Sequence, residues 1–266
     1  MPRFVAMLGA AVGLVAGSVL RVRRAEVEAR LRARGIGDPT RVASAMYVQL
    51  GHGLVELLSL VFPGTSAAPV RLTPRAEAAL RDLVASGGRA VIASAHTGSW
   101  DVLACAMASR VRLSVLTKRL SVSLLDRLWH RVRSRRGIEL LSGAGSIGSA
   151  LAALSRGHAV GAMIDQAPTR GVRHPFLGQD ALHDSTAAVL AHRANCPLIV
   201  AFSWREAGGH VLDVPLVLHP EGSARTFVPS ATRRASTALE ELVRARPEQW
   251  LWLHRRWKGF EKAAPT

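Results

Sequence analysis

The pattern of apolar and polar positions predicts alternating strands and helices over most of the chain. Short apolar runs suit buried strands, and they alternate with segments in which apolar residues recur with a helical period. The predicted strands cover residues 90–95, 111–117, 138–141, 159–164 and 197–203, with a possible edge strand at 211–218. The predicted helices cover residues 40–62, 74–86, 102–108, 122–135, 146–156, 184–194 and 230–246. This alternation predicts an α/β fold in which helices cover both faces of a mainly parallel sheet.

The N-terminal segment has a different pattern. Residues 4–20 are apolar throughout, but they are rich in Gly and Ala and fall short of the roughly 20 residues that a membrane-spanning helix needs. Arginines cluster directly after them, within residues 21–34, as is typical of the cytoplasmic end of a membrane segment. A signal peptide is the alternative, but the run ends in arginines and not in a small-residue cleavage site. We therefore predict a membrane anchor over residues 1–34, either spanning the bilayer or lying against it, before a single domain at 35–266.

Composition adds a strong charge bias. The formal net charge is +16, and nearly all of the excess comes from arginine. Such a charge predicts an acidic partner, which is nucleic acid, anionic lipid headgroups or an acidic carrier protein. Cys105 and Cys196 lie far apart in the sequence, without a Cys-x-x-Cys spacing, which fits a reducing compartment.

The turn between the predicted strand 90–95 and the predicted helix 102–108 carries the strongest candidate chemistry. His96 and Asp101 bracket this turn, and Gly98 permits a tight bend between them. Asp101 falls in the first helical turn, where unpaired N–H groups and the helix dipole favour a carboxylate. A carboxylate beside a histidine makes an oriented general base, which removes a proton from a hydroxyl. The alternative interpretation is a structural histidine capped by a nearby aspartate.

A second motif points to a different function. Residues 143–148 follow the pattern Gly-x-Gly-x-x-Gly after a short strand, and Asp165 ends the next strand. That context fits a dinucleotide site, so an NAD(P)-binding oxidoreductase is one alternative. Because the preceding strand is short and the unit lies in the middle of the chain, we interpret these glycines as a turn and a close helix–sheet contact.

Other sites are not indicated. The ten histidines form no recognised zinc spacing, so no metal or other cofactor is expected. The chain has neither a Gly-x-Ser-x-Gly elbow nor a Walker loop, which argues against a serine hydrolase and a P-loop NTPase.

The turn at residues 96–101, His-Thr-Gly-Ser-Trp-Asp, resembles the His-x4-Asp/Glu block of the lysophospholipid acyltransferase superfamily, specifically its lipid A biosynthesis lauroyl/myristoyl acyltransferase branch. Further matches to that branch follow in the expected order, at Lys118-Arg119, Arg133-Ser-Arg-Arg-Gly137, Ile164-Asp165-Gln166, Pro175-Phe-Leu-Gly178 and residues 247–258. The last segment, Pro-Glu-Gln-Trp-Leu-Trp-Leu-His-Arg-Arg-Trp-Lys, is the most specific match. The resemblance extends from Gly51 onward.

This resemblance implies a membrane-associated acyltransferase at the cytoplasmic face of the inner membrane. It implies transfer of a fatty acyl chain from an acyl thioester, on acyl-carrier protein, to a hydroxyl of a lipid A precursor or related glycolipid. His96 would be the general base, and Asp101 would orient it. The residues expected to bind substrates are Lys118, Arg133, Arg136, Asp165, Gln166, Arg255 and Arg256.

Several of these expectations have ordinary structural alternatives. Arg133 and Arg136 match phosphate geometry, but arginines also cover solvated helix faces. Asp165 should lie on the same sheet edge as His96, where it either faces the crevice or ties down a loop. Arg255 and Arg256 lie among tryptophans, a mixture that suits either a headgroup-level surface or a packed C-terminal helix.

The identity of the substrates is less constrained than the chemistry. Asp101 stands where the lipid A branch commonly has Glu, and the N-terminal quarter shows little resemblance. A lysophospholipid or other glycolipid acyltransferase that uses acyl-CoA therefore remains an alternative. A basic protein that binds anionic lipid or nucleic acid without chemistry is another, although nucleic acid is not the expected partner.

Overall fold

The computed structural model describes residues 3–60, 68–118, 123–143 and 145–260. A seven-stranded sheet has the order β1-β9-β8-β2-β5-β3-β4, and β6 and β7 form a separate two-stranded sheet. Every pairing in the large sheet is parallel except β8 with β9. The strands are β1 (Val70–Leu72), β2 (Ala90–Ser94), β3 (Leu113–Leu116), β4 (Ile138–Leu141), β5 (Ala159–Met163), β6 (Val172–Phe176), β7 (Gln179–His183), β8 (Leu198–Glu206) and β9 (Gly209–Leu218).

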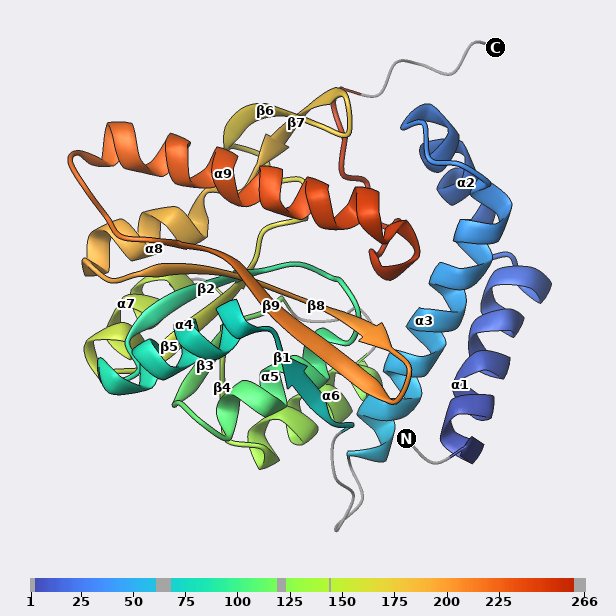
Figure 1. Cartoon of the computed structure of the whole chain (residues 1–266), viewed down its shortest axis with the longest axis horizontal. Coiled ribbons are helices and arrows are strands. Elements are labelled where there is room, and N and C mark those ends of the chain that lie inside the picture. Colours follow the sequence, from blue (N-terminus) through green and yellow to red (C-terminus); the bar gives the residue numbers. More distant parts are fainter. Residues whose placement is uncertain (1–2, 61–67, 119–122, 144, 261–266) are drawn as a thin grey trace.

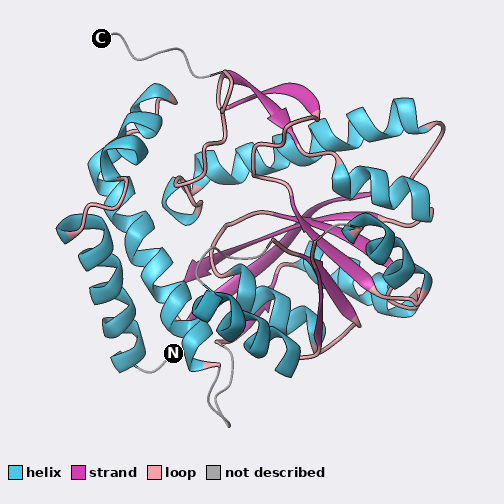
Figure 2. Cartoon of the chain, turned by 180° about the vertical axis from the view of Figure 1, so that it is seen from behind, coloured by secondary structure: helices cyan, strands magenta, loops and turns pink. Residues whose placement is uncertain are grey.

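Helices cover both faces of the large sheet, as Figures 1 and 2 show from opposite sides. They are α1 (Arg3–Leu14), the π-helical turn η1 (Val15–Val19), α2 (Arg24–Ala33), α3 (Pro39–Ser59), α4 (Pro74–Ala85), α5 (Trp100–Ala108), α6 (Ser123–Arg135), α7 (Ser146–Ser155), α8 (Thr186–Ala194), α9 (Ala224–Ala245) and the 3-10 turn η2 (Pro247–Gln249). The predicted α/β fold with a mainly parallel sheet is therefore confirmed.

Alternate residues of each strand face opposite layers. In β2, Val91 and Ala93 pack in the layer that contains α7, α8 and α9, whereas Ala90 and Ile92 pack in the layer that contains α4, α5 and α6. This alternation follows from the two-residue period of a strand, and burial on both sides explains why β2 is apolar without interruption. The central strand is thus covered on both faces.

The N-terminal helices pack against α3 through glycines. A Cβ atom at Gly13 would lie 2.2 Å from the carbonyl oxygen of Tyr47, and one at Gly51 would lie 2.2 Å from that of Gly9. Only glycine permits such a close approach of two helix backbones. Among the described residues, no single helix is long and apolar enough to cross a membrane, although Ala6–Val19 and Arg24–Ala33 meet that criterion as a pair bent by 86°. The predicted spanning segment at residues 4–20 is not confirmed.

The position of β9 in the sheet differs from the prediction. Residues 211–218 were expected at an edge, but β9 pairs with β8 on one side and with β1 on the other. The edge strand next to β9 is β1, whose three residues are too short to produce a recognisable period. The β6–β7 hairpin was also not predicted, because Pro175 and several polar residues interrupt its apolar pattern.

Candidate active site

The carboxyl ends of β2 and β5 bring His96 and Asp165 together. The two strands are parallel, and Ser94 pairs with Met163 in their register. His96 and Asp165 each lie two residues beyond that pair, so they follow the carboxyl ends of neighbouring strands at the same position along the strand direction. The Nδ1 atom of His96 lies 2.8 Å from Oδ1 of Asp165, and the backbone N–H of His96 donates to Oδ2 at 2.9 Å. The predicted location of Asp165 is therefore confirmed, and it contacts the candidate base directly.

Asp165 is fully buried and has several hydrogen-bond donors. In addition to its contacts with His96, Oδ2 accepts a hydrogen bond of 3.0 Å from the indole Nε1 of Trp250. Burial by itself raises the pKa of this carboxyl, but the charge and hydrogen bonds of His96 outweigh it and hold that pKa well below the usual range. The group is thus a fixed anion at neutral pH.

The C-terminal tail closes over the turn that carries His96. Thr97 forms a β-bridge with Trp250, and the N–H of Leu251 donates to the carbonyl oxygen of His96 at 3.0 Å. Gly98, with a φ of 56°, donates its N–H to Gln249. A Cβ atom at Gly98 would lie 2.8 Å from the Cα of Trp204, so both the backbone conformation and the close packing require glycine here.

Asp101 has a different set of partners from the predicted one. It lies in the first turn of α5, as expected, and is 6% exposed. Its Oδ1 atom accepts hydrogen bonds from Nε and Nη2 of Arg133, at 2.9 and 2.7 Å, and from the indole of Trp129 at 3.1 Å. The observed pairing is therefore His96 with Asp165 and Asp101 with Arg133, which corrects the predicted contact of His96 with Asp101. The catalytic roles of these residues stay predictions.

Opposing effects act on the pKa of His96. Burial lowers this pKa by disfavouring the charged ring. The charge of Asp165, its hydrogen bond and the more distant charge of Asp101 raise the pKa, and together they outweigh the effect of burial. The net direction is upward. A histidine with a raised pKa is a stronger base when neutral, and its protonated form is stabilised once it has taken up a proton.

All but one of the remaining predicted substrate residues are exposed or partly exposed, and the exception is Arg256. Lys118 is exposed, and its Nζ atom lies 3.5 Å from Oε1 of Gln166, which follows Asp165 directly. Arg136 lies one turn beyond Arg133 in sequence and is partly exposed, and Arg255 is exposed. Arg119, part of the same predicted motif as Lys118, lies outside the described residues. All of these stay predictions as substrate ligands.

Arg256 lies in the core. It is 1% exposed, and its guanidinium donates to the carbonyl oxygen of Leu182 and to Nδ1 of His183. Burial, and to a smaller extent the charge of Arg256, lower the pKa of His183 to about 3, so this histidine is a neutral acceptor at pH 7. The contacts of Arg256 thus join the C-terminal tail to β7, and its burial does not support the predicted role in substrate binding.

The tryptophans of the tail are also buried. Trp250, Trp252 and Trp257 are each at most 1% exposed and pack against one another and Phe176. The segment runs as turns after η2 and not as a helix. The rings are packed in the core beside Asp165, as the alternative interpretation expected, but the segment that carries them is not a helix. The expected headgroup-level surface is not supported.

Trp100, which contacts His96, lines an apolar cavity. The cavity lies between α5 and the sheet and has a volume of about 60 Å³. Ser94 and Trp100 stand at the end near the site, and the ring of Trp100 contacts that of His96 with centroids 4.9 Å apart. The other lining residues are Ile92, Leu103, Ala104, Met107, Leu113, Val115, Gly161, Ala162, Met163, Ala201 and Leu212. An apolar cavity close to a candidate base suits part of a hydrocarbon chain whose reactive end lies at the ring.

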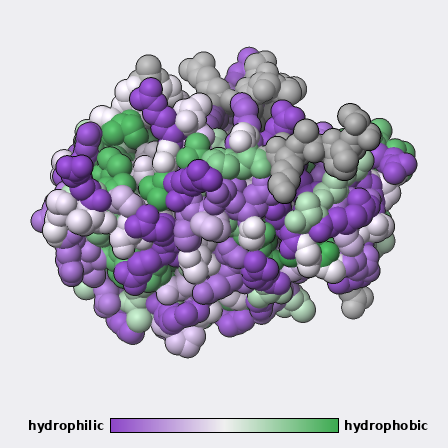
Figure 3. Space-filling model, turned by 90° about the horizontal axis from the view of Figure 1, so that it is seen from above, coloured by the Kyte–Doolittle hydropathy of each residue, from purple (hydrophilic) through white to green (hydrophobic). Residues whose placement is uncertain are grey.

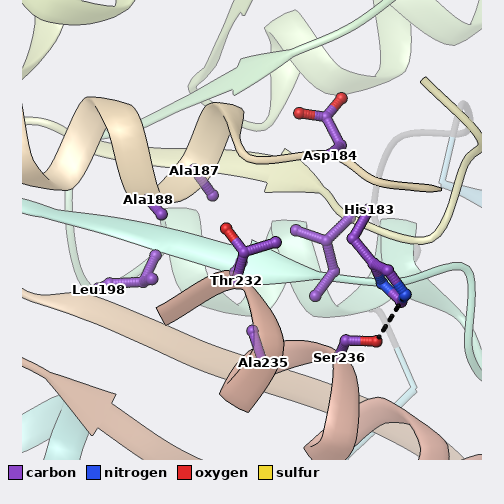
Figure 4. A pocket seen from close by; sticks show the side chains of 10 residues that line it. His183, Asp184, Ala187, Ala188, Leu198, Thr232, Ala235 and Ser236 are labelled. Carbon is purple, nitrogen blue, oxygen red and sulfur yellow. Dashed lines mark hydrogen bonds between the residues drawn. The ribbon is translucent and has the colours of Figure 1, made fainter. Parts of the chain in front are cut away.

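A second cavity lies on the opposite face of the sheet. Ala93 lines it, whereas its neighbours in β2 line the first cavity. Its volume is about 10 Å³, room for about one water molecule. Figure 4 shows His183 and Ser236 at one side of it, joined by a hydrogen bond of 3.4 Å. This space is too small for a substrate.

A second histidine approaches the site from the tail. The rings of His96 and His254 lie with centroids 4.6 Å apart. Ligand atoms of His96, Asp165 and His254 all lie within 4.8 Å of one another, which is close enough to consider a metal ion among the described residues. Burial, and then the charge of His96, lower the pKa of His254 to about 4, so its ring is neutral at pH 7.

The family of the chain follows from comparison with known proteins. The model of the bacterial lipid A biosynthesis acyltransferases matches residues 3–259. The chain belongs to this family. It is therefore an acyltransferase, as the resemblance in the His96 turn and the C-terminal segment implies. None of the curated proteins compared with the chain matches it.

In this lipid A acyltransferase the glycines at 143–148 lie away from the His96 site. They follow β4, the edge strand opposite β1, whereas a dinucleotide binds where the strand order reverses. Gly143 and Gly145 both have a positive φ and form the turn into α7. The interpretation of these residues as a turn is supported, and the oxidoreductase alternative is not.

Sequence reasoning missed two residues that contact Asp165 and His96. Trp250 holds Asp165, and His254 packs beside His96, yet neither was among the predicted site residues. The only available signal was the tail motif itself, in which tryptophans and a histidine recur within a few positions. Their proximity to His96 depends on how the tail folds back, which no local pattern encodes.

Proposed function

We propose that this acyltransferase transfers a fatty acyl chain from the thioester of acyl-carrier protein to a hydroxyl of a lipid A precursor, with His96 as the general base. One observation carries the proposal. The ring of His96 is held by the buried carboxylate of Asp165 at the carboxyl ends of parallel strands, and it packs against Trp100, which lines an apolar cavity. Such a position is where ligands bind in open α/β sheets.

The first step is proton removal from the acceptor hydroxyl. The Asp165 carboxylate holds the proton of the neutral ring on Nδ1, which leaves a lone pair on Nε2. Nε2 takes the hydroxyl proton as the oxygen attacks the thioester carbonyl. The resulting imidazolium faces the Asp165 anion, and the later transfer of its proton to the departing thiolate returns the site to its starting state.

Arg133 is proposed to stabilise the oxyanion of the tetrahedral intermediate. It binds Asp101 through Nε and Nη2, and Nη1 takes no part in that contact. Its side chain is 13% exposed, so its charge acts in a partly desolvated site, where electrostatic stabilisation is strong. In this proposal Asp101 orients Arg133 and adds to the negative potential at His96.

The cavity between α5 and the sheet is proposed to hold the acyl chain. Ala104→Leu should fill part of it and shift the preference toward shorter chains, because each excluded methylene removes about 0.8 kcal/mol of apolar burial, or roughly fourfold in kcat/KM. Ala106→Leu is the matched control, since Ala106 lies on the same helix but does not line the cavity. Competition between thioesters of different lengths measures the shift. An equal shift in both variants would assign the chain to another site.

The donor is tested by supplying one acyl chain on acyl-carrier protein and on coenzyme A. The net charge of +16 predicts faster association with the acidic carrier, and this advantage should fade as salt screens it. We expect kcat/KM for the carrier to exceed that for coenzyme A at low ionic strength and to fall as salt rises. A preference for coenzyme A without salt dependence would assign the enzyme to the lysophospholipid branch instead. Absence of transfer from both donors would contradict the proposed function.

The N-terminal segment is proposed to bind the cytoplasmic face of the inner membrane. Met7, Val19 and Leu20 are 72%, 72% and 67% exposed, and arginines follow them at once. Figure 3 shows that hydrophilic residues predominate on the face seen from above, with hydrophobic residues in small groups. Exposed apolar side chains beside arginines suit an anionic lipid surface.

Point variants test this attachment better than a deletion, because Arg23 and Arg30 bind carbonyl oxygens of Leu253 and Trp252 in the tail. Met7→Asp with Leu20→Asp should lower binding to anionic vesicles by about tenfold or more, since two apolar side chains would no longer be buried in lipid. Val217→Asp, at an exposed apolar position on β9, is the control. Equal flotation of all three proteins would contradict the assignment.

A further inference from the structure

The tail brings an unpartnered nitrogen to the catalytic centre. The Nε2 atom of His254 is buried and has no hydrogen-bond partner. Its ring packs edge-on against His96, with an angle of 65° between the ring planes. An unsatisfied buried polar atom is costly, so its retention at this point calls for a ligand that it can bind.

The neighbouring groups have the chemistry of a metal site. His96 and His254 supply imidazole nitrogens and Asp165 supplies a carboxylate oxygen, and their ligand atoms lie within 4.8 Å of one another. Two histidines and a carboxylate, with water in the fourth position, form a common tetrahedral site for Zn²⁺. The other oxygen of Asp165 is held by the indole of Trp250 and the N–H of His96. Such outer contacts orient a ligating carboxylate.

The geometry requires a modest adjustment. Bonds of about 2.0–2.2 Å to a tetrahedral Zn²⁺ place its ligand atoms roughly 3.3–3.5 Å apart. Nδ1 of His96 and Oδ1 of Asp165 already lie 2.8 Å apart, so the metal needs them to separate slightly. The ring of His254, which is partly exposed in the tail, must also move closer to the other two ligands.

We propose that His96, Asp165 and His254 form a Zn²⁺ site whose occupation reversibly inhibits the enzyme. Zn²⁺ replaces the proton between Nδ1 of His96 and Asp165. A neutral ring that binds metal through Nδ1 carries its remaining proton on Nε2, so it has no lone pair there to accept the proton of a hydroxyl. Binding of the metal stands on the cluster alone, whereas the inhibition rests on the proposed role of His96 as the base.

Binding is tested with Co²⁺ as a spectroscopic substitute for Zn²⁺. Added to the metal-free full chain, Co²⁺ should give the intense visible absorption of a tetrahedral complex, and Zn²⁺ should abolish it. His254→Phe keeps an aromatic ring beside His96 but removes the nitrogen, so the absorption should disappear. His254→Asn is the second variant if the first fails to fold, as judged by melting temperature. His219→Asn, at an exposed histidine, should leave the absorption unchanged.

Inhibition is measured in the acyl transfer assay. Zn²⁺ should inhibit the unmodified enzyme, and a chelator should restore activity. With each protein's rate expressed relative to its own metal-free rate, the inhibition constant should rise about tenfold or more in His254→Phe. Equal inhibition of His254→Phe and the unmodified enzyme, or a Co²⁺ absorption that survives the substitution, would overturn the proposal. Co²⁺ binding that depends on His254 in a protein without acyl transfer would contradict the proposed function but leave the site intact.

Discussion

Replacing His96 with asparagine is expected to lower kcat by about 10²- to 10⁴-fold, the usual contribution of a general base. Asparagine has no group that takes up a proton at neutral pH, but its amide N–H can still donate to Asp165. The melting temperature should therefore change little. The measurement is the initial rate of acyl transfer, together with thermal unfolding of the same preparation.

His158→Asn is the matched control for this substitution. His158 also contacts a carboxylate, with Nδ1 3.3 Å from Oε2 of Glu139, but it precedes β5 and so lies at the opposite edge of the sheet. This variant should retain its rate. If His96→Asn instead lowers the melting temperature while the remaining folded protein keeps its specific activity, His96 has a structural role and the proposed mechanism is wrong.

Asp165→Asn is expected to reduce kcat by a comparable factor, about 10²- to 10⁴-fold. An amide removes the charge that stabilises the imidazolium and no longer selects the tautomer with its proton on Nδ1. Its NH₂ group can also face the ring and present a donor where an acceptor is needed. The melting temperature should fall as well, because Asp165 is fully buried and also accepts from Trp250. Rates must therefore be expressed per folded molecule.

Double variants separate the two acidic residues. If Asp165 acts through His96, then Asp165→Asn should cost little more once His96→Asn is present, since residues that act as a unit are non-additive. Asp101→Asn should be non-additive with Arg133→Gln for the same reason. Non-additivity of Asp101→Asn with His96→Asn, together with full activity of Asp165→Asn, would instead restore Asp101 as the residue that orients the base.

The sequence alone determined the fold class and the location of the candidate base. Apolar runs and helical periods are local properties, so they predicted β2, α5 and β5 with small errors at their ends. Because the carboxyl ends of parallel strands meet at one edge, His96 and Asp165 could be placed on the same side of the sheet. The order of the motifs also indicated the family that the comparison shows.

Only the tertiary structure decided which residues touch at the site. Asp165 follows His96 by 69 positions, and Trp250 follows Asp165 by 85. Their contacts depend on the register of β2 with β5 and on the return of the tail across the sheet edge. The spacing of His96 and Asp101 suggested a dyad because both residues occupy one turn, yet Asp101 binds Arg133 from α6 and not the ring of His96.

The burial of Arg256 is a second feature that only the tertiary structure decided. Arginine is usually a surface residue, but Arg256 is buried because its guanidinium binds His183 and the carbonyl oxygen of Leu182, which come from a distant hairpin. Local patterns report which face of an element is apolar, but they do not report which distant side chain meets it.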